Sequence, residues 1–196
     1  MKNLTRLVLA SVLTLGLFAT ARAAVETYNI DPVHSSVGFG IRHLFSKVPG
    51  SFTKFSGTIV VDRANPAANS VEATIDIGSV NTASDKRDGH LKSPDFFDAA
   101  KFPTITFKSK AWKKTGEDSY DVTGDLSIKG VTKEVVLAVK SLGFGPGMMP
   151  GTQVSGWEAG ATINRRDYGV DGPAMIGRAV GDEVAISISV EADLKK

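Results

Sequence analysis

Residues 31–52 of this 196-residue chain hold two of its three histidines, together with serine and arginine side chains that could take part in chemistry. Asp31, His34 and Ser35 are the residue types of a catalytic acid, base and nucleophile. Such a triad needs three side chains that converge in space, whereas His34 and Ser35, as neighbours on a strand, point to opposite faces. The chain also has no Gly-x-Ser-x-Gly nucleophile elbow. We therefore do not expect nucleophilic catalysis in this stretch.

A resident metal or cofactor is not expected either. His34 and His43 are nine residues apart, an odd spacing that separates them onto opposite faces of a regular strand. A metal site needs several ligands around one point. Only a β-bulge at Gly38 or Gly40 would bring His34 and His43 together, and the other possibility is His43 beside His90 with Asp85 or Asp88. The chain contains no cysteine, which excludes thiolate metal sites, disulfides and thiol catalysis. It also has no Gly-x-x-x-x-Gly-Lys-Ser/Thr phosphate-binding loop.

The alternation of residue types in the same stretch predicts a β-strand with one apolar face. The side chains on this face belong to Val33, Ser35, Val37, Phe39, Ile41 and His43. The opposite face carries His34, Ser36, Gly38, Gly40 and Arg42. We interpret the first face as an inner wall, with His43 at its end. His43 then either hydrogen-bonds a backbone group, as buried polar groups must, or contacts the polar head of a ligand, with Arg42 beside it if the strand twists.

Strand-like alternation continues along the chain. It is clear in residues 71–77, 120–128 and 184–190, and weaker in residues 28–30, 52–62, 104–112, 131–142 and 153–164. One segment, near residues 84–101, is predicted to be helical, with Gly89 and Pro94 keeping its helices short. Eight or more antiparallel strands with one helical interruption predict an all-β fold, either a closed barrel or a two-sheet sandwich.

The N-terminus has the features of a secretory signal peptide. Lys2 and Arg6 precede an apolar run that ends at Ala21-Arg22-Ala23, an Ala-x-Ala cleavage site. We expect residues 1–23 to be removed and residues 24–196 to form one soluble periplasmic domain. Loss of three basic residues with the signal leaves 20 against 21 acidic ones, a net charge of about −1. This charge argues against nucleic acid as a partner.

An outer-membrane barrel is the exported alternative with a similar alternation. Its apolar face would point outward, with aromatic girdles at both rims. Aromatic residues make up only 8% of this chain, and the chain ends on Leu194-Lys195-Lys196. The sequence therefore favours a barrel whose apolar face points inward.

Four segments together resemble the YceI-like family of periplasmic polyisoprenoid- and lipid-binding proteins. They are "YNIDPVHSSVGFGIRHLFSKVPGSFTKFSGTI", "HLKSPDFFDAAKFPTITFKS", "VTGDLSIKGVTKEVVL" and "INRRDYGV" followed by "VGDEVAISISVEADL". The resemblance implies a lipocalin-like extended antiparallel β-barrel of about eight strands. It also implies a long isoprenoid or similar amphiphile as ligand, such as a polyprenyl phosphate, a quinone or a fatty-acid amide. No other cofactor is implied.

Combining this resemblance with the facing of side chains gives a set of candidate ligand contacts. The predicted apolar wall consists of Val37, Phe39, Ile41, Phe45, Ile75, Phe96, Phe107 and Trp157. The predicted contacts of the polar head are Arg42, His43 and His90. We expect a carrier or store without catalysis, and a homodimer is plausible.

Two other functions are weighed against the carrier. The first is a hydrolase or isomerase acting on an amphiphile in the same cavity, with His43 as acid or base. The second is a protein-interaction module whose barrel is filled by its own side chains, with Phe39, Ile75, Phe107 and Trp157 closing the interior. A structure with a tunnel would favour the carrier over the filled barrel.

Overall fold

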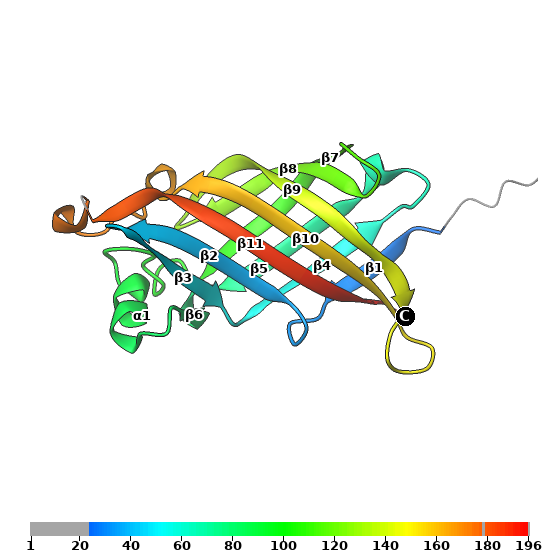
Figure 1. The fold of residues 1–196 in the computed structure, drawn as a ribbon, viewed down its shortest axis with the longest axis horizontal. Coiled ribbons are helices and arrows are strands. Elements are labelled where there is room, and N and C mark those ends of the chain that lie inside the picture. Colours follow the sequence, from blue (N-terminus) through cyan, green and yellow to red (C-terminus); the bar gives the residue numbers. More distant parts are fainter. Residues whose placement is uncertain (1–23, 178, 196) are drawn as a thin grey trace, which may run out of the picture.

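Eight antiparallel strands pair in a closed ring. The structure, a computed structural model, describes residues 24–177 and 179–195, so the predicted signal peptide lies outside it. The ring runs β1, β4, β5, β7, β8, β9, β10, β11, and β11 pairs again with β1. These strands are β1 (Glu26–Ile30), β4 (Phe55–Val61), β5 (Ser70–Asp76), β7 (Thr104–Lys114), β8 (Ser119–Ile128), β9 (Val131–Pro146), β10 (Gln153–Asn164) and β11 (Val180–Leu194). The predicted all-β extended barrel is confirmed (Figure 1).

Three further strands lengthen the barrel at one end. They are β2 (Ser36–His43), β3 (Ser46–Phe52) and β6 (Val80–Asn81). β2 follows β1 after residues 31–35, and both pair with β11. β3 pairs with β2 and with β6, while β4, which follows β3 directly, pairs with β1 and β5. β1 and β2 thus pair one after the other along the same strand, β11, and β2, β3 and β6 extend the sheet beyond the closed ring.

One α-helix, α1 (Asp85–Lys92), lies beside β6 at the lengthened end (Figure 1). Residues 93–101, which we predicted to be helical as well, form turns instead. The backbone N–H of Ser93 closes the last turn of α1 on the carbonyl of His90, and Pro94 has no N–H to continue it. Within the described residues, none of the helices is long and apolar enough to cross a membrane.

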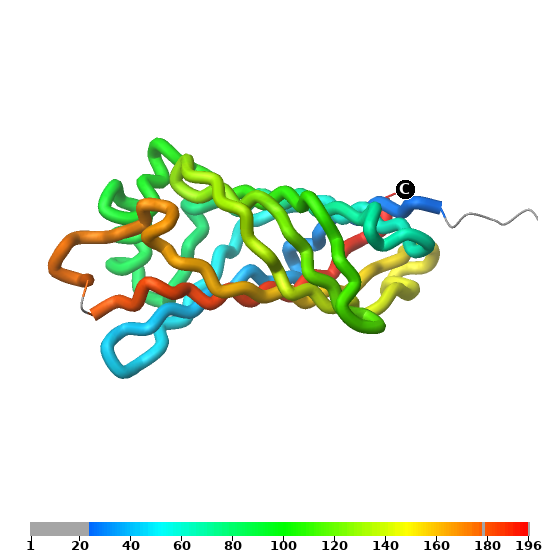
Figure 2. The backbone as a smooth tube through the Cα atoms, turned by 90° about the horizontal axis from the view of Figure 1, so that it is seen from above, coloured from blue at the N-terminus to red at the C-terminus, as the bar shows by residue number. Residues whose placement is uncertain are grey.

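Two clusters of buried side chains fill the barrel, one toward each end. The first contains Tyr28, Trp112, Trp157 and their neighbours and lies at the end where the described chain begins, before β1, and ends, after β11 (Figure 2). The second contains Val37, Phe52 and Tyr168 and lies toward α1. The clusters overlap only through partly buried side chains such as those of Phe107 and Ile188. The middle of the barrel is therefore incompletely filled.

Candidate ligand-binding cavity

An apolar cavity of about 550 Å³ extends through the interior between these clusters. Alternate residues of the strands point into it, as the period of a strand requires. Its middle is lined by Val37, Phe39, Ile41, Ile75, Ile105, Phe107, Leu126, Leu137, Ile163, Ile186 and Ile188. These side chains offer a ligand hydrocarbon contact and no hydrogen-bonding group. A guest in this part of the cavity must itself be apolar.

Aromatic rings close the cavity at the end with the chain termini. Trp112 and Trp157 line its last part, and the ring of Phe144 packs edge-on against Trp157 with 5.6 Å between centroids. The rings of Tyr28 and Phe144 pack with 5.9 Å between their centroids, and the guanidinium carbon of Arg63 lies 4.1 Å from the Phe144 ring centroid. Arg63 also donates a hydrogen bond of 3.2 Å to the hydroxyl of Tyr28. This layer separates the cavity from the loops beyond it.

The cavity opens at the opposite end, beside α1. The lining residues that are exposed to solvent include His43, Arg87 and His90, and the half-buried Ile176 and Val180 accompany them. They come from the end of β2, from α1 and from the chain leading into β11. These three segments lie together at the left end of the molecule in Figure 1. The charged and imidazole side chains at this end are thus grouped at the mouth, while Ser56 on β4 and Glu158 on β10 are exposed polar lining residues elsewhere along the barrel.

Two irregular segments form a roof beside the mouth. Phe96 and Phe97 come from the turns after α1, and Tyr168 and Val170 come from the chain after β10; all four line the cavity. The segments are joined by a 3.0 Å hydrogen bond from the N–H of Gly172 to the carbonyl of Asp95. The Nζ of Lys129 donates to the carbonyls of Gly169, at 2.9 Å, and Pro94, at 3.3 Å. Because backbone and ammonium bonds hold it, the roof is a built part of the fold.

Arg87 brings a positive charge to the mouth. Its Nε donates to the Oγ1 of Thr82 at 2.7 Å, and its Nη2 donates to the carbonyl of Thr82 at 2.6 Å. Thr82 is itself held by the carboxylate of the buried Asp88. The guanidinium is thus fixed in orientation, while Arg87 forms no ion pair with any residue that the structure describes. It is well placed to meet an anionic or strongly polar head group.

The two histidines at the mouth differ in their surroundings. The Nε2 of His90 lies 2.8 Å from a carboxylate oxygen of Asp95, and its ring packs edge-on against Phe96 at 4.9 Å between centroids. The ring of His43 lines the mouth and makes no hydrogen bond within the described part of the chain. His43 therefore retains both ring nitrogens for a ligand or for water.

Arg165 also lines the cavity, but each of its three guanidinium nitrogens donates a hydrogen bond to the protein. It donates to the carbonyls of Gly181, Val170 and Asp171 and to the carboxylate of Asp182. Burial and the neighbouring Arg166 lower the pKa of Arg165, and the hydrogen bond from Arg166 lowers the pKa of Asp182. We assign Arg165 to holding the roof, because its donors point at backbone oxygens rather than into free space.

Most of the side chains selected from the sequence lie around the cavity. Those that line it are Val37, Phe39, Ile41, Ile75, Phe96, Phe107 and Trp157, with His43 and His90 at the mouth. The interior is not closed by Phe39, Ile75, Phe107 and Trp157, as the filled-barrel hypothesis required; these side chains surround the free volume.

Three placements need correction. Phe45 was assigned to the apolar wall by extending the alternation past His43, but β2 ends at His43, and Leu44 and Phe45 form the hairpin loop before Ser46. The side chain of Phe45 is consequently fully exposed. Arg42 points to the outer face, where its Nη1 donates to the carbonyl of Leu44 at 3.1 Å. Val33 is 80% exposed because residues 31–35 lie between strands.

Arg87 was missed by the sequence reasoning, although a signal for it was present. In an α-helix, positions three and four apart share a face. Arg87, His90 and Leu91 have that spacing, and all three line the cavity. Once the segment is predicted to be helical and His90 is placed at the ligand, Arg87 follows.

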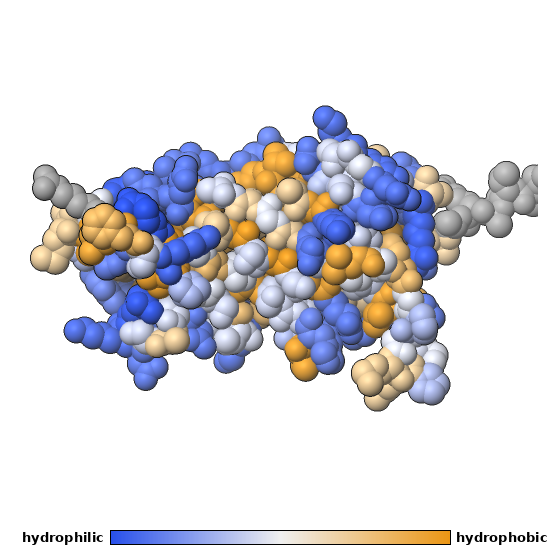
Figure 3. All heavy atoms as spheres, viewed as in Figure 1, coloured by the Kyte–Doolittle hydropathy of each residue, from blue (hydrophilic) through white to orange (hydrophobic). Residues whose placement is uncertain are grey.

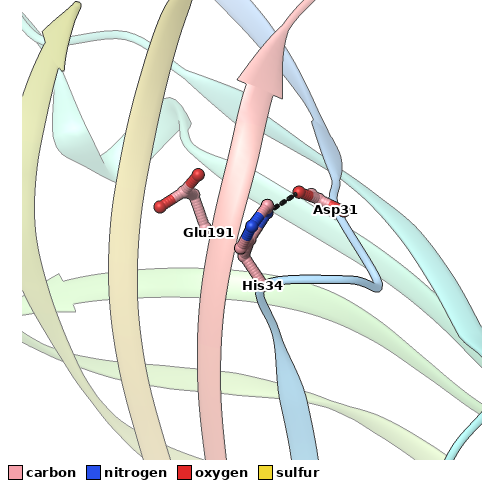
Figure 4. A group of neighbouring side chains, drawn as sticks. All are labelled: Asp31, His34 and Glu191. Carbon is pink, nitrogen blue, oxygen red and sulfur yellow. Dashed lines mark hydrogen bonds and ion pairs between the residues drawn. The ribbon is translucent and has the colours of Figure 1, made fainter. Parts of the chain in front are cut away.

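The polar residues at the start of residues 31–52 form a separate group on the outside of the barrel. The Nδ1 of His34 lies 2.5 Å from a carboxylate oxygen of Asp31, and Glu191 on β11 lies on the other side of the imidazole (Figure 4). The hydroxyl of Ser35 bonds the backbone of Glu191 instead of His34. Among the described residues, Asp31, His34 and Glu191 are the group with metal-ligand spacing. Asp31 already accepts from His34 and from the N–H of Val33, which accounts for its orientation without an ion.

Comparison with known proteins agrees with this architecture. The sequence model of the YceI-like domain family matches residues 28–192, nearly all of the described chain. The chain belongs to the YceI-like family. It is 40% identical over 201 residues to Protein YceI of Salmonella arizonae, covering 100% of this chain and 99% of that protein.

Solved structures show the same YceI-like barrel. The crystal structure of BcnA from Burkholderia cenocepacia matches with a TM-score of 0.72 and 28% identity, covering 83% of this chain and 98% of BcnA. A polyisoprenoid binding domain from Saccharophagus degradans matches with a TM-score of 0.65 and 18% identity, covering 86% of this chain and 98% of that domain. At that identity the second likeness concerns the fold alone.

Proposed function

We propose that this protein is a soluble periplasmic carrier or store of an isoprenoid-type lipid, or of a similar long-chain amphiphile, held in the barrel cavity. The observation that carries the proposal is the distribution of polarity along the cavity. Aromatic side chains close one end, hydrocarbon lines the middle, and Arg87, His43 and His90 stand at the open end. An amphiphile with one long apolar chain and one polar head has the same distribution.

Burial of the chain supplies most of the binding free energy. At roughly 25 cal/mol per Å² of apolar surface removed from water, a chain that buries several hundred Å² gains on the order of 10 kcal/mol before ordering costs. This contribution depends little on the chemical identity of the chain. The head group then decides orientation and preference through the residues of the mouth.

The ligand classes supported by this arrangement are a polyprenyl phosphate, a quinone and a fatty-acid amide. Each has a long apolar part and a head that accepts hydrogen bonds, which the donors of Arg87 can satisfy. An isoprenoid is the first class to test, because one protein with this fold, from Saccharophagus degradans, is a polyisoprenoid binding domain.

The decisive experiment is native mass spectrometry of protein released from the periplasm without detergent, followed by solvent extraction. We expect an apolar guest in a fixed ratio to the protein. Failure of detergent-free release would contradict a soluble periplasmic protein. Preparations that never contain an apolar guest, and that do not take up added prenyl chains, would remove the carrier function.

The alternative of an enzyme is tested at His43. If His43 is an acid or base, His43→Gln should abolish turnover of the extracted lipid and leave its uptake unchanged. For the carrier we expect His43→Gln to alter only the preference among head groups. Chromatography of the lipid after incubation, with and without the protein, separates the two outcomes.

A further inference from the structure

The mouth of the cavity is surrounded by apolar side chains that the barrel does not bury. Phe45 at the tip of the β2–β3 hairpin is fully exposed, Leu44 beside it is 50% exposed, and Met175 in the loop that leads into β11 is 87% exposed. Large apolar side chains that are this exposed on two segments at one end of the molecule need an explanation. We call these three residues the apolar rim.

The apolar rim is a defined part of the fold. The N–H of Leu44 donates a 2.7 Å hydrogen bond to the carbonyl of Ala179, which joins the hairpin to the chain leading into β11. Leu44 takes a left-handed backbone conformation with a φ of +48°, which costs free energy for a residue other than glycine. The backbone of the hairpin tip is therefore held in place, with the side chains of Leu44 and Phe45 exposed. In Figure 2 the β2–β3 hairpin projects from the barrel, and Figure 3 shows orange, apolar atoms at the end of the molecule that carries α1.

The rim is continuous with the entrance to the cavity. His43 lines the mouth and immediately precedes Leu44, while Ile176 lines the mouth and immediately follows Met175. A lipid leaving the cavity would pass these side chains first. If the rim were inserted among acyl chains, the lipid would not have to cross water.

Positive charge accompanies the rim on the same hairpin. Arg42 and Lys47 face each other across β2 and β3, directly behind the loop. Both side chains are exposed, and neither forms an ion pair with any residue in the described part of the chain. Apolar side chains at a tip with cations just behind them match the layering of a bilayer that contains anionic lipids.

We infer that the apolar rim is a docking surface for a bilayer containing anionic phospholipids, through which the cavity exchanges its lipid. Leu44, Phe45 and Met175 enter the acyl boundary, and Arg42 and Lys47 meet the phosphates. The inference rests on the lipid-binding function proposed above and identifies the partner from which the lipid comes. It also fixes the orientation of the barrel, with the mouth toward the membrane and the chain termini away from it.

The test is co-sedimentation of the exported protein, its N-terminus checked by mass spectrometry, with vesicles of phosphatidylethanolamine and phosphatidylglycerol. We expect Phe45→Ser combined with Met175→Ser to lower the vesicle affinity by roughly tenfold or more, as loss of two buried apolar side chains implies. The matched control is Met148→Ser with Met149→Ser, because these methionines are exposed large apolar side chains in the loop at the closed end. The control should bind vesicles as the wild type does.

The charges are tested separately. Arg42→Gln with Lys47→Gln should weaken binding to vesicles that contain phosphatidylglycerol and leave the weaker binding to pure phosphatidylcholine unchanged. The difference in vesicle affinity between the wild type and this variant should become smaller as salt is added, because salt screens the charges.

Three outcomes would overturn the docking surface. They are unchanged vesicle binding in the rim variant, equal loss in the closed-end control, and self-association of the wild type that the rim variant abolishes without vesicles. The last would assign the rim to a second copy of the chain. Native mass spectrometry of the same samples distinguishes failure of this proposal from failure of the carrier function. If lipid is retained but vesicles are not bound, only the docking proposal is wrong. If vesicles are bound but no lipid is ever retained, only the carrier proposal is wrong.

Discussion

The indole rings of Trp112 and Trp157 meet edge to face at the closed end of the cavity, with 5.8 Å between centroids and 81° between planes. Their strands, β7 and β10, are not neighbours in the sheet, so the contact crosses the interior of the barrel. The two nitrogens differ. The Nε1 of Trp157 donates to the Oγ of Ser155 at 3.0 Å, whereas the Nε1 of Trp112 is buried without an acceptor among the described residues.

This difference predicts that replacing each tryptophan by phenylalanine lowers the free energy of unfolding by different amounts. Trp157→Phe removes the donor to Ser155, a fully buried residue, whereas Trp112→Phe breaks no such bond. We expect the free energy of unfolding to fall by about 1–3 kcal/mol more for Trp157→Phe, the cost of leaving a buried polar group unpartnered. Urea denaturation of both variants measures the difference. Equal losses would mean that the hydrogen bond contributes nothing.

A second prediction concerns the width of the cavity. A Cβ at Gly50 would lie 2.2 Å from the ring of Phe39, so Gly50→Ala must displace a ring that lines the cavity. The free space beside the ring is the cavity, and overpacking of this kind costs about 1–3 kcal/mol. We expect roughly tenfold weaker binding of a long prenyl alcohol, measured by displacement of a fluorescent fatty acid. Gly145→Ala is the control, because no atom lies within 4 Å of a Cβ added there. An equal loss of affinity in the control would show that displacement of Phe39 is not the cause.

Arg87 should govern the preference among head groups. Arg87→Gln keeps a donor at the mouth and removes the charge. We expect affinity for a prenyl phosphate to fall about threefold to tenfold relative to the prenyl alcohol of the same chain, since a solvent-exposed charge contributes modestly. The control is Lys108→Gln, because Lys108 is paired with Glu72 on the outer surface. An unchanged ratio of the two affinities would show that the phosphate does not reach Arg87.

The Asp31–His34 pair predicts a pH dependence outside the cavity. The hydrogen bond with Asp31 raises the pKa of His34 above 6.5, and the same bond lowers the pKa of Asp31 below 3.8. The contribution of the pair to stability is therefore complete between pH 3.8 and 6.5. It is lost as pH rises through the raised pKa of His34, or falls through the lowered pKa of Asp31.

This effect is measured by NMR titration of the His34 ring. We expect Asp31→Asn to bring the pKa of His34 down toward its usual value. His90→Gln, at the other end of the barrel, should leave the His34 titration unchanged. A titration of His34 that is indifferent to Asp31→Asn would show that the pair does not form in solution.

Much of the barrel could be predicted because strand alternation depends on local sequence. Val37, Phe39, Ile41 and His43 were placed on one face by counting, and the structure puts all four around the cavity. The same counting failed at Phe45, where the strand had ended. Periodicity describes the inside of an element and contains no information about the position of its last residue.

The sequence by itself determined that apolar side chains form a continuous inner face, because the pairing of antiparallel strands follows from their periodicity and short connections. Tertiary structure decided which end of the cavity is open and which side chains guard it. Leu44 turns outward where its N–H meets the carbonyl of Ala179, and the roof beside the mouth forms where the N–H of Gly172 meets the carbonyl of Asp95. Contacts between segments far apart in the chain fix these positions, and residue order along one segment does not encode them.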